Sequence, residues 1–254
     1  LIAGHELATR DALREAAELA EVLGAPVFQQ TVAYAAHFHT EHPAFMGSLT
    51  RTQSVARAAL MPYDLAVNLG GDMLRMSVYS PLDALPEGMP IVHISERDAE
   101  LGKNYATEIA IHASVKTTLR ALIPLLRRKM NADQVSAAKN RMAEVAKNNW
   151  SAKRAKLVAD MAARADTQPI DPRFLMMQIA DALPEDAVVV EEGLTSTSSL
   201  QSFLRVRDAQ CFHGLASGGI GFAMAGAVGV SLALPQRPVY AMIGDGSAMY
   251  TIQA

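Results

Sequence analysis

The feature that most constrains this chain is the alternation, through its first half, of short apolar runs with amphipathic helical segments. Strands that alternate with helices form parallel sheets, because each helix returns the chain across a sheet face. Between residues 11 and 23, apolar residues recur at helical spacing and Gly24 follows, which predicts a helix that ends there. The other elements expected in this half are strands 1–3, 25–28, 64–69, 89–94 and 109–111 and helices 52–60 and 114–128.

A second α/β unit is expected to begin near Ile170. Asp171 and Pro172 form a typical helix start, with a capping side chain followed by Pro at the first helical position. The elements predicted after them are helix 174–183, strand 187–191, the Gly- and Ala-rich helix 219–233, strand 239–243 and a last helix over 247–254.

Between these units, residues 127–164 hold ten Lys or Arg against three Asp or Glu. One interpretation is an arm that binds nucleic acid or phosphate. No aromatic stacking surface is interleaved, and Trp150 alone does not make one. We therefore interpret the stretch as a solvated, largely helical linker and divide the chain into 1–130, 131–169 and 170–254.

Composition narrows the choice of partners and compartment. A net charge of −3 gives no global reason to expect nucleic acid or anionic lipid. No apolar stretch is long enough to cross a bilayer, so no membrane contact is expected. With a single cysteine, Cys211, no internal disulfide can form, so a cytoplasmic location is expected. Cys211 lies in an apolar run, which favours a buried structural thiol over a nucleophile. The chain opens inside a strand-like run without Met, so we expect an internal piece of a longer polypeptide.

The most informative motif follows the last predicted strand, where Gly244-Asp245-Gly246-Ser247 opens a helix. Ligands of open α/β sheets bind beyond the carboxyl ends of strands. Glycines let a phosphate approach the backbone, and the first N–H groups of a helix face an anion placed there. One carboxylate beside a diphosphate is a usual way to hold Mg²⁺.

Two further segments have the same character. Residues 215–223 begin a helix with a glycine cluster, and residues 191–197 end a strand with hydroxyl side chains that suit phosphate contacts. Three such edges within about 60 residues could line one anion pocket.

In this order, the segments around Glu192, Gly218 and Asp245 resemble the diphosphate-binding domain of thiamine diphosphate enzymes, most of all the benzoylformate decarboxylase-like branch, with acetolactate synthase-like enzymes as relatives. The first half resembles the central domain of the same family. The resemblance implies an α/β fold with a Rossmann-like parallel-sheet central domain followed by a partial thiamine diphosphate-binding domain.

The resemblance also implies roles for particular residues. Asp245 would ligate Mg²⁺, and Ile220 would be the aliphatic wedge that holds the cofactor bent. The activating Glu and a second metal ligand would lie outside this chain. The remaining residues implied in cofactor binding are Thr195, Ser196, Gly218, Gly219, Gly244, Gly246 and Ser247.

Three histidines, His37, His39 and His42, cluster near Glu41. A zinc site is one interpretation, although the spacing matches no familiar pattern. The segment from His42 to Gly47 also resembles one in benzoylformate decarboxylase-like enzymes whose histidine reaches the active site and handles protons, which makes His42 the candidate catalytic residue. A surface histidine before a Pro turn is the alternative.

The resemblance implies a thiamine diphosphate- and Mg²⁺-dependent lyase that decarboxylates a small 2-oxo acid through the C2 carbanion of the cofactor. The alternatives are an acetolactate synthase-like carboligase and a non-catalytic cofactor-binding or scaffold homologue. Gly70-Gly71-Asp72 could indicate a nucleotide site, but the arginine-containing segments of FAD-binding relatives are not evident, so FAD is not expected. A homo-oligomer, as a dimer of dimers, is implied, and this piece alone is expected to be inactive.

Overall fold

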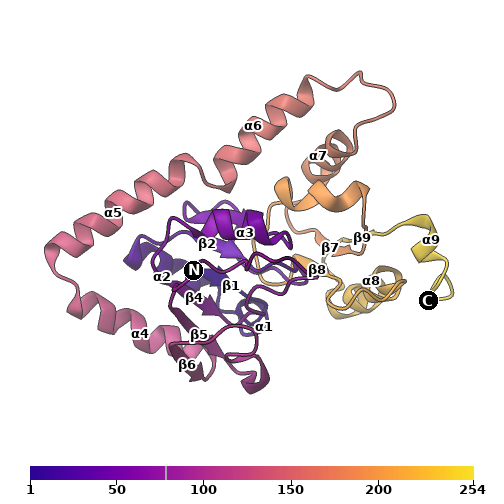
Figure 1. Ribbon diagram of the computed structural model, residues 1–254. Coiled ribbons are helices and arrows are strands. Elements are labelled where there is room, and N and C mark those ends of the chain that lie inside the picture. The colour runs from indigo at the N-terminus through magenta and orange to yellow at the C-terminus, as the bar shows by residue number, and fades with distance from the viewer. Residues whose placement is uncertain (78) are drawn as a thin grey trace.

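The computed structural model describes residues 1–77 and 79–254 and confirms the α/β fold, with two parallel sheets in two lobes (Figure 1). The first lobe contains a six-stranded sheet in the order β3-β2-β1-β4-β5-β6. Because β1 pairs with both β2 and β4, the winding of the chain reverses between β1 and β4. The strands are β1 (Ile2–Ala3), β2 (Val27–Gln29), β3 (Phe45–Ser48), β4 (Ala66–Leu69), β5 (Ile91–Ser95) and β6 (Ile109–His112).

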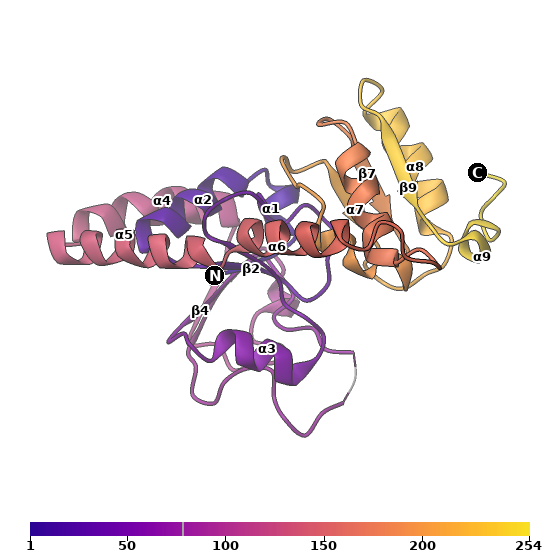
Figure 2. The same cartoon turned by 90° about the horizontal axis from the view of Figure 1, so that it is seen from above.

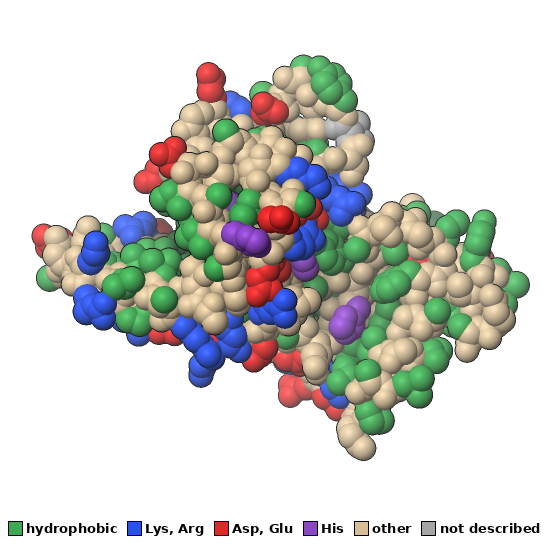
Figure 3. All heavy atoms as spheres, turned by 90° about the horizontal axis from the view of Figure 1, so that it is seen from below, with side chains coloured by type: hydrophobic (Ala, Val, Ile, Leu, Met, Phe, Trp, Pro, Cys, Tyr) green, Lys and Arg blue, Asp and Glu red, His purple; other side chains and the backbone are tan. Residues whose placement is uncertain are grey.

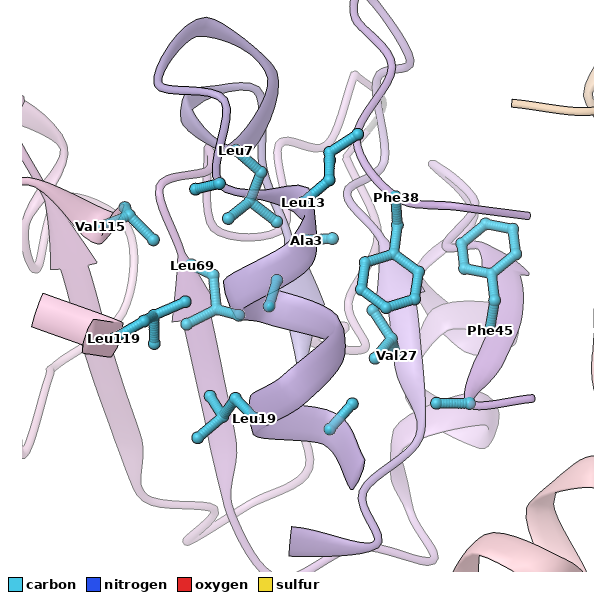
Figure 4. Packing of buried hydrophobic residues seen from close by; sticks show 14 of the residues in the cluster. Ala3, Leu7, Leu13, Leu19, Val27, Phe38, Phe45, Leu69, Val115 and Leu119 are labelled. Carbon is cyan, nitrogen blue, oxygen red and sulfur yellow. The ribbon is translucent and has the colours of Figure 1, made fainter. Parts of the chain in front are cut away.

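Helices cover both faces of the first sheet. The helix α2 (Leu13–Leu23) packs with α4 (Val115–Lys129) over one face, where Leu19, Leu69 and Leu119 meet in a buried cluster (Figure 4). A second cluster contains Leu60, at the end of α3 (Gln53–Leu60). The apolar periodicity of residues 11–23 therefore marks the buried side of α2, and Gly24 ends the helix in a left-handed conformation, with φ of 61°. The first lobe also has the short helices α1 (Glu6–Thr9) and η1 (Asp98–Glu100).

The second lobe holds a three-stranded parallel sheet in the order β8-β7-β9. Asp171 caps its first helix as expected, since its side chain accepts from the Arg173 N–H at 2.9 Å. The elements are α7 (Pro172–Ala182), β7 (Val188–Glu191), η2 (Ser196–Ser202), β8 (Phe212–Gly214), α8 (Phe222–Ala233), β9 (Val239–Met242) and α9 (Asp245–Ala248).

The basic stretch is helical, as expected, and consists of α5 (Ala132–Lys147) and α6 (Trp150–Ala162), which form an arm from the first lobe to the second (Figures 1 and 2). It is not simply solvated. Trp150 is buried, packs against Phe45 of the first lobe and donates from Nε1 to the Gln201 carbonyl of the second, at 3.0 Å. The interpretation as a solvated linker is therefore wrong for α6, whose side chains bridge the two lobes.

The segment after β2 also joins the lobes. Ala35 forms an isolated antiparallel bridge with His213 of β8, and the Gly214 N–H donates to the Tyr34 carbonyl at 3.1 Å. Farther along, the Thr40 hydroxyl accepts from the Val206 N–H at 2.9 Å. Residues 31–44 therefore act as an extra backbone partner at the edge of the second sheet.

Three predictions about elements were incomplete or wrong. The strands β3 and β8 were not predicted, because both are short and β3 contains Gly47 with φ of 102°, which interrupts any alternating pattern. The helix expected over 247–254 is wrong in extent, since α9 ends at Ala248. Beyond it the Thr251 hydroxyl donates to the Gly221 carbonyl at 2.7 Å, a contact that turns the chain toward α8.

None of the helices in the described part of the chain combines the length and the apolar character that crossing a membrane requires.

Candidate active site

Three loops meet at the carboxyl edge of the second sheet. Glu191, the last residue of β7, pairs with Gly214 of β8 on one side and with Met242 of β9 on the other. The strands are parallel, so the loops that follow them leave from the same edge. These loops are 192–197, 215–221 and 243–247, and they contain every residue predicted to bind the cofactor or metal.

Glu192 fixes two of these loops to each other. Its side chain is only 4% exposed, and its two carboxylate oxygens accept from the backbone N–H groups of Gly221 and Ala223, each at 2.6 Å. This internal anion satisfies the free N–H groups at the start of α8 and complements the positive end of the helix dipole. Two of the N–H groups at the amino end of α8 are therefore already occupied by a side chain of the protein itself.

Asp245 is the first residue of α9, and its side chain is exposed. Its Oδ1 accepts from the Gly246 N–H at 2.8 Å, and within the described residues it forms no ion pair. Nor do the described residues include any cluster of three or more His, Cys, Asp or Glu that could hold a metal. The candidate Mg²⁺ ligand is thus a single carboxylate, which suits an ion whose other ligands are phosphate oxygens and water. The same finding removes the interpretation of His37, His39 and His42 as a zinc site.

The glycines at the carboxyl edge of the second sheet (the second edge) show whether these loops have room for a phosphorylated cofactor. A Cβ added to Gly219, Gly244 or Gly246 would meet no atom within 4 Å, and none of the three has a positive φ. Neither crowding inside the chain nor backbone conformation requires glycine there. The open space in front of them leaves room for a ligand to contact the backbone directly, so these loops fit the group.

Side chains of the same edge are free to bind an anion. Thr195 and Ser196 are exposed at the start of η2, and their hydroxyls make no hydrogen bond within the described chain. Thr197 differs, because its hydroxyl donates to Glu191 Oε1 at 2.7 Å. Ile220, the candidate wedge, is 53% exposed beside Gly218, whose φ of 81° favours glycine.

His42 lies elsewhere in the fold. It precedes β3 and therefore stands at the amino end of the first sheet. Its Nδ1 accepts from the Ala44 N–H at 3.1 Å, and its Nε2 lies 3.3 Å from Glu21 Oε1. The structure does not bring His42 together with the three loops of the second edge, and its catalytic role stays a prediction.

Cys211 is buried at the edge of the second core, and burial raises the pKa of its thiol. A thiol that resists ionisation is a poor nucleophile, in agreement with the structural role expected for it.

A cleft of about 450 Å³ separates the two lobes next to the second edge. Gly193, Thr197 and Gly218 line it from the second lobe, and Arg51 and Arg75 line it from the first. Burial raises the pKa of Glu191, which also faces this cleft. Sequence reasoning missed Arg51 and Arg75, because they lie far along the chain from the three loops and only the docking of the lobes brings them to the cleft.

A second cavity, about 800 Å³, is a mainly apolar groove between the start of the first sheet and α5, lined by residues such as Leu1, Phe28 and Val145. It contains none of the predicted site residues.

The carboxyl edge of the first sheet is closed by its own side chains. A Cβ on Gly4 would lie 2.1 Å from the Cα of Gly71, so β1 and β4 end in close contact. Around them Tyr34 and His5 form a 2.7 Å hydrogen bond, and Arg97 pairs with Asp72 at 2.5 Å. The Gly70-Gly71-Asp72 turn thus builds an internal polar network at the position where an open α/β sheet would take a nucleotide.

The fold and the second edge together define a class of protein, an α/β protein with an open, glycine-rich carboxyl edge of a parallel sheet. Family models for this class match most of the chain. Residues 1–122 match the thiamine pyrophosphate enzyme central domain, and residues 194–254 match the thiamine pyrophosphate enzyme C-terminal TPP binding domain. The chain belongs to the thiamine pyrophosphate (thiamine diphosphate) enzyme family.

Relatives agree with this assignment. The chain is 28% identical over its whole length to benzoylformate decarboxylase of Pseudomonas aeruginosa, of which it covers 44%. It is 27% identical, again over its whole length, to acetolactate synthase of Mycobacterium bovis, of which it covers 40%. Among solved structures, 99% of the chain aligns with 44% of a thiamine diphosphate-dependent 4-hydroxybenzoylformate decarboxylase of Rhodococcus jostii, with a TM-score of 0.77 and 26% identity. The chain therefore spans less than half the length of these relatives.

Proposed function

We propose that the protein containing this chain is a Mg²⁺-dependent thiamine diphosphate lyase that decarboxylates a small 2-oxo acid without oxidation. The observation that carries the proposal is the open second edge, where an exposed carboxylate, Asp245, stands among glycines that the fold itself does not require. The similarity to two decarboxylases of 2-oxo acids supports the reaction class.

In this proposal the three loops divide the work of holding the cofactor. Asp245 ligates Mg²⁺, and the backbone of Gly244, Gly246 and Ser247 lies against the diphosphate. Free hydroxyls at Thr195 and Ser196 donate to phosphate oxygens. Glu192 contributes indirectly, because it holds the start of α8 to the end of β7.

Ile220 and the glycines Gly218 and Gly219 form the remaining wall. An exposed aliphatic side chain in this loop can press on the body of the cofactor and hold its shape. When bound, thiamine diphosphate supplies a nucleophilic carbon and an electron sink for the departure of carbon dioxide, while the protein orients the reactants and excludes water. His42 is proposed to transfer protons, which requires it to reach the substrate from the first lobe.

We further propose a homo-oligomer, a dimer of dimers, in the cytoplasm, with no nucleic acid or membrane partner. FAD is not part of the proposal, because Tyr34, His5, Asp72 and Arg97 form an internal polar network at the crevice of the first sheet. An acetolactate synthase-like carboligase is the second candidate, and the 27% identity to acetolactate synthase favours it.

The first test measures cofactor retention by Asp245→Ala in the full-length protein. Calorimetry with Mg²⁺ present should show tight uptake of thiamine diphosphate by the unmodified protein and none by the variant, because the ion loses its only protein carboxylate in this loop. Asp160→Ala, an exposed aspartate of the arm, is the matched control and should bind normally. Unchanged affinity in Asp245→Ala would remove this residue from the metal site, and no uptake by the unmodified protein would contradict the proposed function.

A further inference from the structure

The cleft between the lobes has walls of different character. Its first-lobe side carries Arg51 and Arg75 together with the hydroxyls of Thr31 and Ser77. Its second-lobe side carries residues from two of the three candidate loops, 192–197 and 215–221. No aromatic side chain is among the described residues that line it. In the space-filling view charged side chains gather over the first lobe and its junction with the second, whose visible face is mostly uncharged (Figure 3).

The two arginines differ in what they already bind. Arg75 is tied across the cleft, because its Nη1 donates to the Ala216 carbonyl at 3.3 Å and lies 3.5 Å from Asp72 Oδ2. It therefore helps to hold the lobes together and is partly neutralised.

Arg51 has no such partner. Its Nη1 donates to the Ser77 hydroxyl at 3.1 Å, and no carboxylate pairs with it in the described part of the chain. The acidic side chains of the same cleft are engaged elsewhere, Glu191 with the Thr197 hydroxyl and Glu192 with the start of α8. A planar guanidinium with free donors is well suited to a carboxylate or a similar anion.

We infer that this cleft binds an anionic group that the substrate keeps throughout the reaction, with Arg51 as the residue that recognises it. The inference rests on the proposed function, since the cleft adjoins the cofactor loops at Thr197 and Gly218.

The chemistry of decarboxylation argues against the scissile carboxylate of the 2-oxo acid as the anion that Arg51 binds. The scissile carboxylate loses its charge as carbon dioxide leaves, so an arginine bound to it would stabilise the starting state more than the transition state and slow the step. A retained anion remains bound equally in both states and serves recognition.

Two substrates could supply that anion. One is a 2-oxo diacid, whose second acid group is remote from the bond that breaks. The other is a 2-oxo acid that acts as acceptor in carboligation, where its own carboxylate is kept. Both place a carboxylate in the cleft, and a substrate with only an aromatic tail would leave Arg51 without a partner.

The test uses the full-length holoenzyme and matched pairs of substrates. Decarboxylation is compared between 2-oxoglutarate and the uncharged 2-oxopentanoate, with benzoylformate as the aromatic reference. Carboligation is compared between pyruvate and acetaldehyde as acceptors of the same donor. In one of these pairs the anionic member should be preferred, and Arg51→Ala should lower its kcat/KM by about 10- to 100-fold, the effect of losing a hydrogen bond to a charged group.

Two further variants separate recognition from damage to the fold. Arg51→Lys keeps the positive charge without the planar pair of donors, and it should recover part of the kcat/KM lost in Arg51→Ala. Arg14→Ala removes an exposed arginine of α2 and should leave all rates unchanged. The pair that responds to Arg51→Ala identifies the source of the anion.

Preference for benzoylformate, with equal rates in Arg51→Ala and the unmodified protein, would overturn this inference and leave the proposed function standing. If no substrate reacts and calorimetry detects no thiamine diphosphate, the proposed function itself fails.

Discussion

The carboxyl edges of the two parallel sheets are built alike, but one is closed and the other is open. In each, glycines follow the strands and a helix or turn begins just beyond. At the first edge Gly4 and Gly71 press against each other, and charged side chains fill the remaining space. At the second edge Gly219, Gly244 and Gly246 face open space.

The difference shows that glycine after a strand has two separate causes. One is the close approach of two backbones, which an added Cβ would prevent. The other, under the proposed function, is room for a molecule that is not part of the chain. The two causes respond differently to the same small substitution, and this gives direct ways to break or sharpen the comparison.

The largest effect is expected at the closed edge, for Gly4→Ala. The new Cβ would lie 2.1 Å from the Gly71 Cα, so β1 and β4 would have to separate at the centre of the sheet. We expect a loss of about 3 kcal/mol in the free energy of unfolding of the first lobe. Urea unfolding followed by circular dichroism measures it, and a stability equal to that of the unmodified protein would show that the contact is not close.

The next effect concerns the internal anion of the open edge. Glu192→Gln places an amide N–H against one of the two backbone N–H groups that the carboxylate now accepts, at Gly221 and Ala223. We expect a loss of about 2 kcal/mol in the stability of the second lobe, faster amide exchange at these two residues and weaker cofactor binding.

Its neighbour provides the matched control. Among the side chains that the structure describes, Glu191 accepts from the Thr197 hydroxyl alone, and a glutamine oxygen can accept the same bond. Glu191→Gln should therefore change the exchange of residues 221–223 little. Equal exchange in the two variants would contradict the positioning role of Glu192.

A smaller and more selective effect is expected for Gly246→Ala at the open edge. Alanine is the better helix former, and no atom lies near the new methyl group, so the stability should stay unchanged or rise by about 0.5 kcal/mol. Calorimetry should nevertheless show thiamine diphosphate affinity lowered by about tenfold, roughly 1.4 kcal/mol, because the methyl group occupies the ligand's space. A fall in stability with unchanged affinity would show that Gly246 is required by the fold and not by the ligand.

The last effect is a pH dependence at the junction of the lobes. His37 is fully buried with no hydrogen-bond partner for either ring nitrogen among the described residues, and burial lowers its pKa from 6.5 to about 3. Below pH 6.5 the unfolded chain therefore binds a proton at His37 that the folded chain does not. The free energy of unfolding is highest above pH 6.5 and falls as the pH drops toward 3, by up to about 1.4 kcal/mol per pH unit.

His37→Leu should flatten this part of the stability curve, measured as urea midpoints between pH 7 and pH 5. Burial also lowers the pKa of His5, His39, His93 and His213, so part of the slope will remain in the variant. Identical slopes in the two proteins would show that His37 does not titrate in this way.

Local pattern in the sequence determined most of the architecture. The periodicity of residues 11–23, the capping pair Asp171-Pro172 and the apolar run before Gly244-Asp245-Gly246 each depend on neighbours in the chain, and the structure contains a helix, a helix start and a strand at these places. The three loops of the second edge could also be predicted to meet, because parallel strands end on the same side.

Only the tertiary structure decided what fills each edge. The partners of Glu192 lie 29 and 31 residues away, Arg75 reaches a carbonyl 141 residues away, and Gly4 lies against Gly71, which follows β4. No local pattern records such contacts, because their geometry depends on how strands are ordered and how the lobes dock. Glycines after a strand therefore form a close backbone contact in one sheet and face open space in the other.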